Sequence, residues 1–180
     1  MAVMPELAQD YVIFDVETTG LKPEEGHAVV EMAAERVRGA SIIDTFEAIV
    51  NPERKIDAEA AAVHGITDEV VKRHGKPLIE VMPAFMLFCS GAILVAHNIR
   101  FDLSFVNSHL LKLGLPTLTN PLLDTLELAK QKVSLASYSL AYLAKHFQIH
   151  QPKAHRAMAD VEVTRELLFK LLALPESLKK

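Results

Sequence analysis

The sequence predicts an α/β fold with one mixed sheet, in which an antiparallel meander is followed by parallel strands and helices flank the sheet. Three β-branched or aromatic runs near the N-terminus are joined by short turns, as in a meander. Two short apolar runs then alternate with segments of helical periodicity, which is typical of parallel strands with helical connections. A chain of 180 residues that is 50% hydrophobic suits one domain over 1–180, with its core over about 8–174.

The meander is expected to begin with an uninterrupted apolar strand that leads from Tyr11 to Glu17 and into a Thr-Thr-Gly turn. An exposed turn over 22–26 precedes the second strand, 28–38, and the third strand, 41–50. Gly39 and Ala40 between them predict a tight hairpin. Gly20 is expected to supply a positive φ in the turn after the first strand.

The remaining chain predicts helices around two buried strands, which are expected over 92–96 and 122–123. Thr67 is a candidate N-cap for a helix, and the basic cluster 72–76 is expected to form a solvated loop. Pro83 is expected to bend a helix over 77–88. The other helices are expected over 58–63, from near 102 to about 113, and over 126–132, 140–147 and 158–172.

The overall composition excludes several classes of protein. A net charge of −4 argues against a general attraction to nucleic acid, although bound cations can supply positive potential locally. The single cysteine, Cys89, excludes a disulfide framework and is expected to be a buried core residue in a reducing compartment. Because no run is long and apolar enough for a membrane span and residues 1–9 do not resemble a secretory signal, a cytoplasmic protein without membrane contact is expected.

The first strand ends in two carboxylates, Asp15 and Glu17. Side chains alternate in a strand, so both point to the same face, and Val16 points to the other. Two carboxylates held together at the end of a buried strand resist ionisation, and a protein keeps such a pair when a cation lies between them. The alternative is a half-exposed strand with an acidic outer face. The absence of polar alternation before Asp15 favours the buried strand and the cation.

Two more carboxylates and a histidine occupy related positions. Asp102 follows a buried strand at the start of a helix, and Asp160 lies in the first turn of the last long helix. His155, five residues before Asp160, is expected in the preceding loop, where it can lie over the ligand of Asp160. Each has an ordinary explanation, because carboxylates favour helix N-termini and histidine is common on surfaces. All of them together indicate one site.

Three segments of the chain resemble the motifs of the DEDDh exonucleases, a family that includes the proofreading epsilon subunit of bacterial DNA polymerase III. The segments are 15–21 (DVETTGL), 97–102 (HNIRFD) and 155–160 (HRAMAD). The resemblance covers nearly the whole chain in the same order. It implies an RNase H-like fold, two divalent cations (Mg²⁺ or Mn²⁺) and 3′→5′ removal of nucleoside 5′-monophosphates from single-stranded or frayed 3′ ends of DNA or RNA.

The resemblance also implies a role for each residue of the motifs. Asp15 is expected to bridge both cations, Glu17 and Asp160 to hold the first cation, and Asp102 to hold the second. His155 is the candidate general base, since imidazole exchanges protons near neutral pH. Oxygen ligands favour Mg²⁺ or Mn²⁺ over zinc. The candidate contacts to the nucleic acid are Thr18, Thr19, Gly20, Leu21, His64, Asn98 and Phe101.

Several alternatives stay open at this point. DNA proofreading or repair is the favoured function, but an exoribonuclease would differ only in contacts to the 2′-OH, which the sequence does not reveal. A non-catalytic, polymerase-accessory binding module and endonuclease chemistry are disfavoured by the complete set of acidic residues and the histidine. Residues 174–180 show no tail for tethering to a polymerase, which favours a stand-alone nuclease or an isolated domain. A homodimer, known among similar enzymes, stays open.

Overall fold

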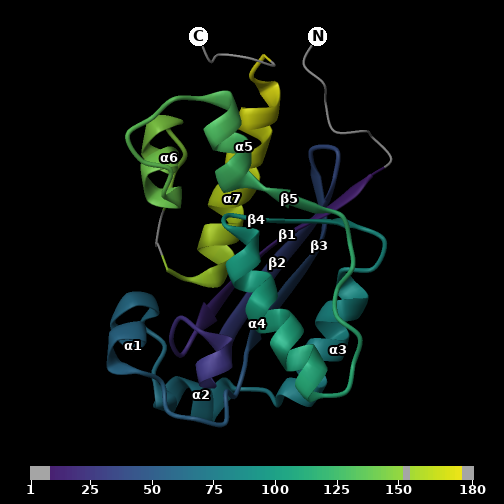
Figure 1. Cartoon of the computed structure of the whole chain (residues 1–180), viewed down its shortest axis with the longest axis vertical. Coiled ribbons are helices and arrows are strands. Elements are labelled where there is room, and N and C mark those ends of the chain that lie inside the picture. The colour runs from purple at the N-terminus through teal and green to yellow at the C-terminus, as the bar shows by residue number, and fades with distance from the viewer. Residues whose placement is uncertain (1–8, 152–154, 176–180) are drawn as a thin grey trace.

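The computed structural model describes residues 9–151 and 155–175 and contains one mixed sheet (Figure 1). The five strands lie in the order β3-β2-β1-β4-β5. β1 pairs antiparallel with β2 and β2 with β3, whereas β1 pairs parallel with β4 and β4 with β5. The predicted meander and the two predicted parallel strands are therefore confirmed. The strands span Asp10–Thr18 (β1), Val29–Arg38 (β2), Ser41–Ile49 (β3), Ile93–Ala96 (β4) and Leu122–Asp124 (β5).

Helices cover the two faces of the sheet. α7 packs on β1 and β2, and α5 and α6 pack against α7. α3 and α4 pack against each other and against the sheet (Figure 1). Every helix among the described residues is too short or too polar to span a bilayer. The helices are η1 (Pro23–Glu25), α1 (Ala58–His64), α2 (Asp68–His74), α3 (Leu78–Phe88), α4 (Ile99–Lys112), α5 (Thr125–Lys132), α6 (Leu140–His146) and α7 (Ala157–Ala173).

β1 is buried on both of its faces, as its apolar run predicts. Val12, Phe14 and Val16 belong to the core with α3 and α4, whereas Tyr11 and Ile13 belong to the core with α7. Because side chains alternate between the two faces of a strand, residues 15 and 17 share the face of residues 11 and 13. The side chains of residues 15 and 17 therefore lie on the α7 face of the sheet, beyond the end of its apolar core.

Two local expectations were wrong. Lys72, Arg73 and His74 form the last turn of α2 and not a loop. Thr67 caps the start of this helix, and basic side chains at its C-terminal end interact favourably with the helix dipole. Gly20 does not adopt a positive φ. The ring of His27 instead fills the space that a Cβ of Gly20 would occupy, so close packing explains this glycine.

Cys89 and His109 are two of the buried residues that carry titratable groups away from the acidic cluster. Cys89 is fully buried, as expected, and burial raises the pKa of its thiol to about 12. His109 on α4 is 1% exposed, and its Nε2 accepts a hydrogen bond of 3.1 Å from the backbone N–H of Val29. Its Nδ1 has no hydrogen-bond partner among the described residues. Burial, with a smaller contribution from the charge of Lys112, lowers the pKa of His109 to about 4.

We expect His109 to make folding stability depend on pH. Between the ordinary pKa of 6.5 and the folded value of about 4, the unfolded chain binds a proton that the folded chain does not. Stability is therefore lost as the pH falls through this range, by roughly 3 kcal/mol in total. In urea denaturation from pH 6.5 to 4, His109→Gln should show a smaller pH dependence than the parent. His74→Gln, an exposed control, should not. An unchanged slope for His109→Gln would contradict the prediction.

Candidate active site

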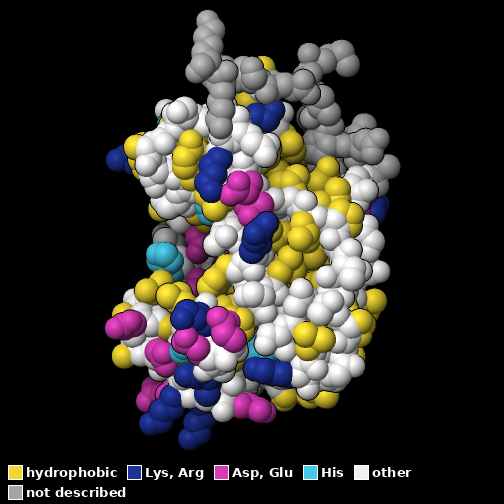
Figure 2. Space-filling view, in the orientation of Figure 1, with side chains coloured by type: hydrophobic (Ala, Val, Ile, Leu, Met, Phe, Trp, Pro, Cys, Tyr) yellow, Lys and Arg dark blue, Asp and Glu magenta, His cyan; other side chains and the backbone are white. Residues whose placement is uncertain are grey.

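An open hollow of about 270 Å³ lies beside the N-terminal end of α7. In Figure 2 it is the recess on the left side, where acidic side chains lie at its floor and a histidine lies at its mouth. It collects every residue for which the sequence predicts a metal-binding or general-base role. Its lining is formed by Asp15, Val16, Glu17, His97, Phe101, Asp102, Ser139, Leu140, Ala141, Gln151, His155 and Asp160.

The four carboxylates reach the hollow from three elements. β1 supplies Asp15 and Glu17, which are half-buried, and the first turns of α4 and α7 supply Asp102 and Asp160, which are buried. Oδ1 of Asp102 accepts a hydrogen bond of 3.2 Å from the backbone N–H of Val16. This bond joins the start of α4 directly to β1 and holds Asp102 beside the β1 pair.

His155 lies before α7 in a loop conformation, with φ of 60°, and its side chain is exposed. Its backbone N–H donates to Oδ2 of Asp160 at 2.8 Å, and Nε2 of Gln151 donates to Oδ1 at 3.0 Å. Ligand atoms of Glu17, His155 and Asp160 all lie within 4.8 Å of one another, so these three residues could hold a metal ion. Pro152, the sequence marker of this loop, lies outside the described residues.

Burial raises the pKa of all four carboxylates, and the charges of neighbouring acids add to it. Burial is the largest cause for Asp15, whose pKa lies well above its usual range, and the charges of Asp102, Glu17 and Asp160 add to it. Burial, with the charges of Asp160 and Glu31, raises the pKa of Glu17 to about 8. Burial raises the pKa of Asp102 to about 8, against the opposing hydrogen bond from Val16. Burial also raises the pKa of Asp160.

These residues fit divalent cations. Among the described residues, none donates a hydrogen bond to the carboxylates of Asp15 and Glu17, although both are crowded by other acids. A cation offsets such crowding, because an opposite charge within a few ångströms favours the ionised carboxylate. Carboxylate oxygens are hard ligands, which suit Mg²⁺ or Mn²⁺.

Three of the predicted contacts to nucleic acid are buried and bonded within the protein. Oγ1 of Thr19 accepts a hydrogen bond from the N–H of Ala28 at 3.0 Å, and Oγ1 of Thr18 donates to the carbonyl of Gly20 at 2.6 Å. Nε2 of His64 lies 3.3 Å from the carbonyl oxygen of Thr18. Burial lowers the pKa of His64, against the opposing effect of this hydrogen bond. These side chains support the turn that follows Glu17.

The other predicted contacts are more open. Leu21 is 77% exposed in the turn after β1, so its side chain is accessible to a ligand, although single exposed apolar residues are common on protein surfaces. Asn98 is exposed at the N-cap of α4 with φ of 68°. Phe101 is the one of the seven whose side chain lines the hollow among the described residues.

The structure also brings His97, Gln151 and Glu31 to the site, to which the sequence had assigned no role. His97 joins the start of α5 to the segment before α6, with Nδ1 3.0 Å from Oγ1 of Thr125 and Nε2 2.9 Å from the carbonyl oxygen of Tyr138. Gln151 bonds Asp160 as described above. Only the position of His97 within the second motif could have drawn attention to it, because the other two depend on contacts across the fold.

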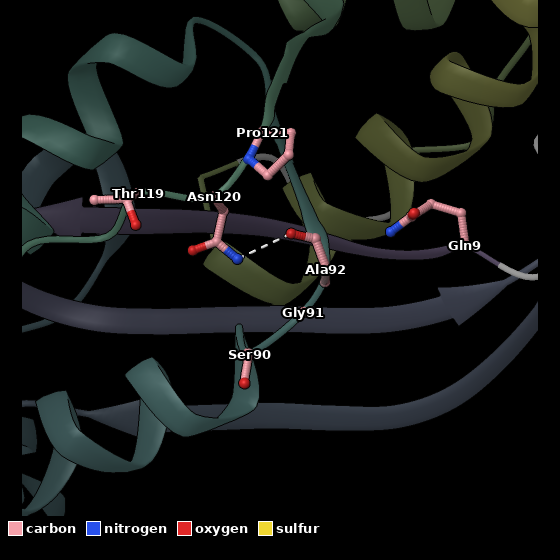
Figure 3. A pocket seen from close by; sticks show the side chains of 7 residues that line it. All are labelled: Gln9, Ser90, Gly91, Ala92, Thr119, Asn120 and Pro121. Carbon is pink, nitrogen blue, oxygen red and sulfur yellow. Dashed lines mark hydrogen bonds between the residues drawn. The ribbon is translucent and has the colours of Figure 1, made fainter.

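A second hollow, of about 410 Å³, lies around the N-terminal end of β4 (Figure 3). Nδ2 of Asn120 donates hydrogen bonds to the carbonyls of Cys89 and Ala92 there, which ties the chain before β5 to the start of β4. Its described lining is neutral and holds no group suited to acid–base or metal chemistry: Gln9, Ser90, Gly91, Ala92, Thr119, Asn120 and Pro121.

The chain is similar in sequence to known exonuclease domains and DNA polymerases. A family model described as Exonuclease matches residues 12–168. The chain is 42% identical over 168 residues to a "DNA polymerase III PolC-type" of Caldanaerobacter subterraneus, which covers 92% of this chain and 12% of that protein. It is 41% identical over 163 residues to the protein of the same name from Lactococcus lactis, with 90% and 10% covered. The chain thus spans about an eighth or less of the length of these relatives.

Solved structures of exonucleases share the fold. Exonuclease X in complex with 5′ overhanging duplex DNA superposes with a TM-score of 0.72 at 28% identity, over 90% of each chain. Escherichia coli exonuclease I in complex with a dT13 oligonucleotide superposes with a TM-score of 0.80 over 91% of this chain and 40% of that one, and at 19% identity it supports the fold alone. The RNase H-like fold implied by the motifs is confirmed. The chain belongs to the exonuclease family.

Proposed function

We propose that the chain is a metal-dependent 3′→5′ exonuclease domain that removes nucleoside 5′-monophosphates from 3′ ends of DNA. One observation carries the proposal: the carboxylates of Asp15, Glu17, Asp102 and Asp160 and the side chain of His155 line one open hollow. Membership of the exonuclease family supports it.

Asp15, Glu17, Asp102 and Asp160 would be the residues that hold two Mg²⁺ or Mn²⁺ ions. When bound, such ions neutralise the phosphate and stabilise both the attacking and the leaving oxygen of an in-line displacement. The raised pKa values of Glu17 and Asp102, about 8 each, describe the site without cations. The carboxylates would therefore exchange protons for cations on binding.

His155 would act as the general base. A water oxygen forms the new bond to phosphorus and one of its protons passes to the imidazole, while the bond to the 3′ oxygen of the preceding nucleotide breaks and that oxygen takes up a proton from solvent water. His155 lines the hollow with an exposed side chain, which leaves it free to meet a substrate, while its own backbone N–H donates to Asp160. Phe101, which lines the hollow, and exposed Leu21 are the side chains best placed to contact the terminal bases.

DNA is the proposed substrate because the relatives named above are DNA polymerases and because exonuclease X is bound to DNA in its structure. Proofreading within a polymerase is the proposed setting, since two relatives of PolC type contain segments that are 42% and 41% identical to this chain. An exoribonuclease is the competing function.

A comparison of matched oligonucleotides tests the proposal. DNA and RNA of one sequence, single-stranded and as a duplex with a mismatched 3′ end, are labelled either at the 5′ end or in the 3′-terminal nucleotide and incubated with Mg²⁺ or Mn²⁺, with and without chelator. We expect stepwise shortening of DNA from the 3′ end, mononucleotide products, and no reaction with chelator. Faster hydrolysis of RNA would favour the exoribonuclease, internal fragments would indicate an endonuclease, and binding without hydrolysis would indicate an accessory module.

A further inference from the structure

Glu31 on β2 is a further carboxylate beside the acidic hollow, and it faces Glu17 across the β1–β2 pair. It is 8% exposed. Unlike Glu17, it is fully engaged by donors from the start of α7. Nε of Arg156 lies 3.1 Å from both carboxylate oxygens, Nη2 lies 2.5 Å from Oε1, and the backbone N–H of Ala157 donates to Oε2 at 3.0 Å.

These contacts replace the cap that α7 lacks in its own sequence. The N-cap residue, Arg156, has no side-chain acceptor for the first N–H groups of the helix. Glu31 supplies one from a neighbouring strand, and its negative charge interacts favourably with the helix dipole. The forked, charge-assisted bonds to Arg156 make this contact specific in direction as well as in distance.

The position of Asp160 and His155 depends on the same turn of α7. Asp160 lies in the first turn, and its carboxylate accepts the N–H of His155, the residue just before the cap. A start of α7 that shifts or frays would move both side chains relative to Glu17 on β1. Because Glu31 already has its full set of donors, it is poorly suited to ligate a cation.

We propose that Glu31 and Arg156 form a clamp that positions Asp160 and His155 against the β1 carboxylates. Both are positioning residues and act through the start of α7. The inference rests on the function proposed above, but the binding of a metal ion can be measured without any nuclease reaction.

The chain contains a matched control for this clamp. Glu35, also on β2, is 3% exposed and accepts a hydrogen bond of 2.6 Å from Nε of Arg165 on α7. This ion pair joins the same two elements, but further along α7 and away from the hollow. Loss of either pair removes a buried contact between β2 and α7, and only loss of Glu31 frees the start of the helix.

The test compares Glu31→Gln with Glu35→Gln in the full chain. Binding of Mn²⁺ is followed by electron paramagnetic resonance, kcat and KM are measured with a single-stranded DNA oligonucleotide, and folding is measured by urea denaturation. We expect Glu31→Gln to lose roughly 10–100-fold in Mn²⁺ affinity and in kcat, with KM changed less, as for other residues that orient metal ligands. Glu35→Gln should lose stability but keep the parent's Mn²⁺ affinity and kcat.

A second pair of variants tests the same clamp if Glu31→Gln folds poorly. Arg156→Lys keeps the charge and should retain more Mn²⁺ affinity than Arg156→Gln, which removes it. Losses in Glu31→Gln and Glu35→Gln that are equal and follow their stabilities would overturn the inference, as would a Glu31→Gln protein that matches the parent in Mn²⁺ affinity and kcat. A parent that binds Mn²⁺ but releases no nucleotide would refute the proposed function instead. The Mn²⁺ affinities of the variants, compared with that of the parent, would still test the clamp.

Discussion

Asp15→Asn is expected to lower the release of nucleotides by about three orders of magnitude or more, because metal ions contribute several kcal/mol to the stabilisation of phosphoryl transition states. Asp15 is the carboxylate most affected by the others, with Asp102, Glu17 and Asp160 all raising its pKa in addition to burial. An amide of the same shape keeps the packing but cannot offer a charged oxygen to a cation. The measurement is single-turnover hydrolysis of an end-labelled DNA oligonucleotide at saturating Mg²⁺ or Mn²⁺.

The folded state should tolerate this change. Folding raises the pKa of Asp15 above its ordinary value of 3.8, so the unfolded chain gives up this proton more readily than the folded chain. The folded protein therefore loses stability as the pH rises above 3.8. Without metal ions at neutral pH, Asp15→Asn should therefore be at least as stable as the parent in thermal denaturation. Asp44→Asn, an exposed change on β3, is the control and should hydrolyse DNA at the parent rate. A well-folded Asp15→Asn protein with undiminished hydrolysis would disprove the assignment of the site.

His155→Gln is expected to reduce kcat by roughly 10²–10⁴-fold, which is the usual contribution of a positioned general base. The backbone N–H of residue 155 still holds Asp160 in this variant, so Mn²⁺ binding should be largely kept. The limb of the pH–rate profile that reports the base should disappear. His150→Gln, a change of another exposed histidine, is the control and should keep both the rate and the profile.

The same measurements separate two roles for His155. One of its ring nitrogens lies within 4.8 Å of a carboxylate oxygen of Glu17 and of one of Asp160, so a ligand role is geometrically available. If Mn²⁺ affinity falls together with kcat in His155→Gln, the side chain acts as a ligand. A pH–rate profile that matches that of the parent would rule out the general base.

Much of the fold follows from local patterns in the sequence. The apolar run before Asp15 predicted a strand that is buried on both faces, and its neighbours in the sheet supply the two cores that bury it. Thr67 accepts the capping hydrogen bond expected from its position. Such features are visible because the strand period, the helix period and the capping geometry each involve only a few consecutive residues.

Other features could not be seen locally. Gly20 is a glycine because His27 packs against it, and the basic residues after Thr67 are helical because the cap and the helix dipole favour them there. In the sequence, Glu31 is an ordinary acidic residue of the second predicted strand. Its position opposite Glu17 follows only from the β1–β2 register. These outcomes depend on contacts between segments that are distant along the chain.

The sequence by itself determined the mixed sheet, the strand that carries Asp15 and Glu17, and the helix starts that carry Asp102 and Asp160. It could do so because hydrophobic periodicity and helix signals encode them within short windows. Only the tertiary structure decided how these acids come together. A hydrogen bond from the backbone N–H of Val16 holds Asp102 beside β1, and the clamp from Glu31 on β2 holds the start of α7. Strand register and helix docking set these distances, and both arise from packing across the whole domain.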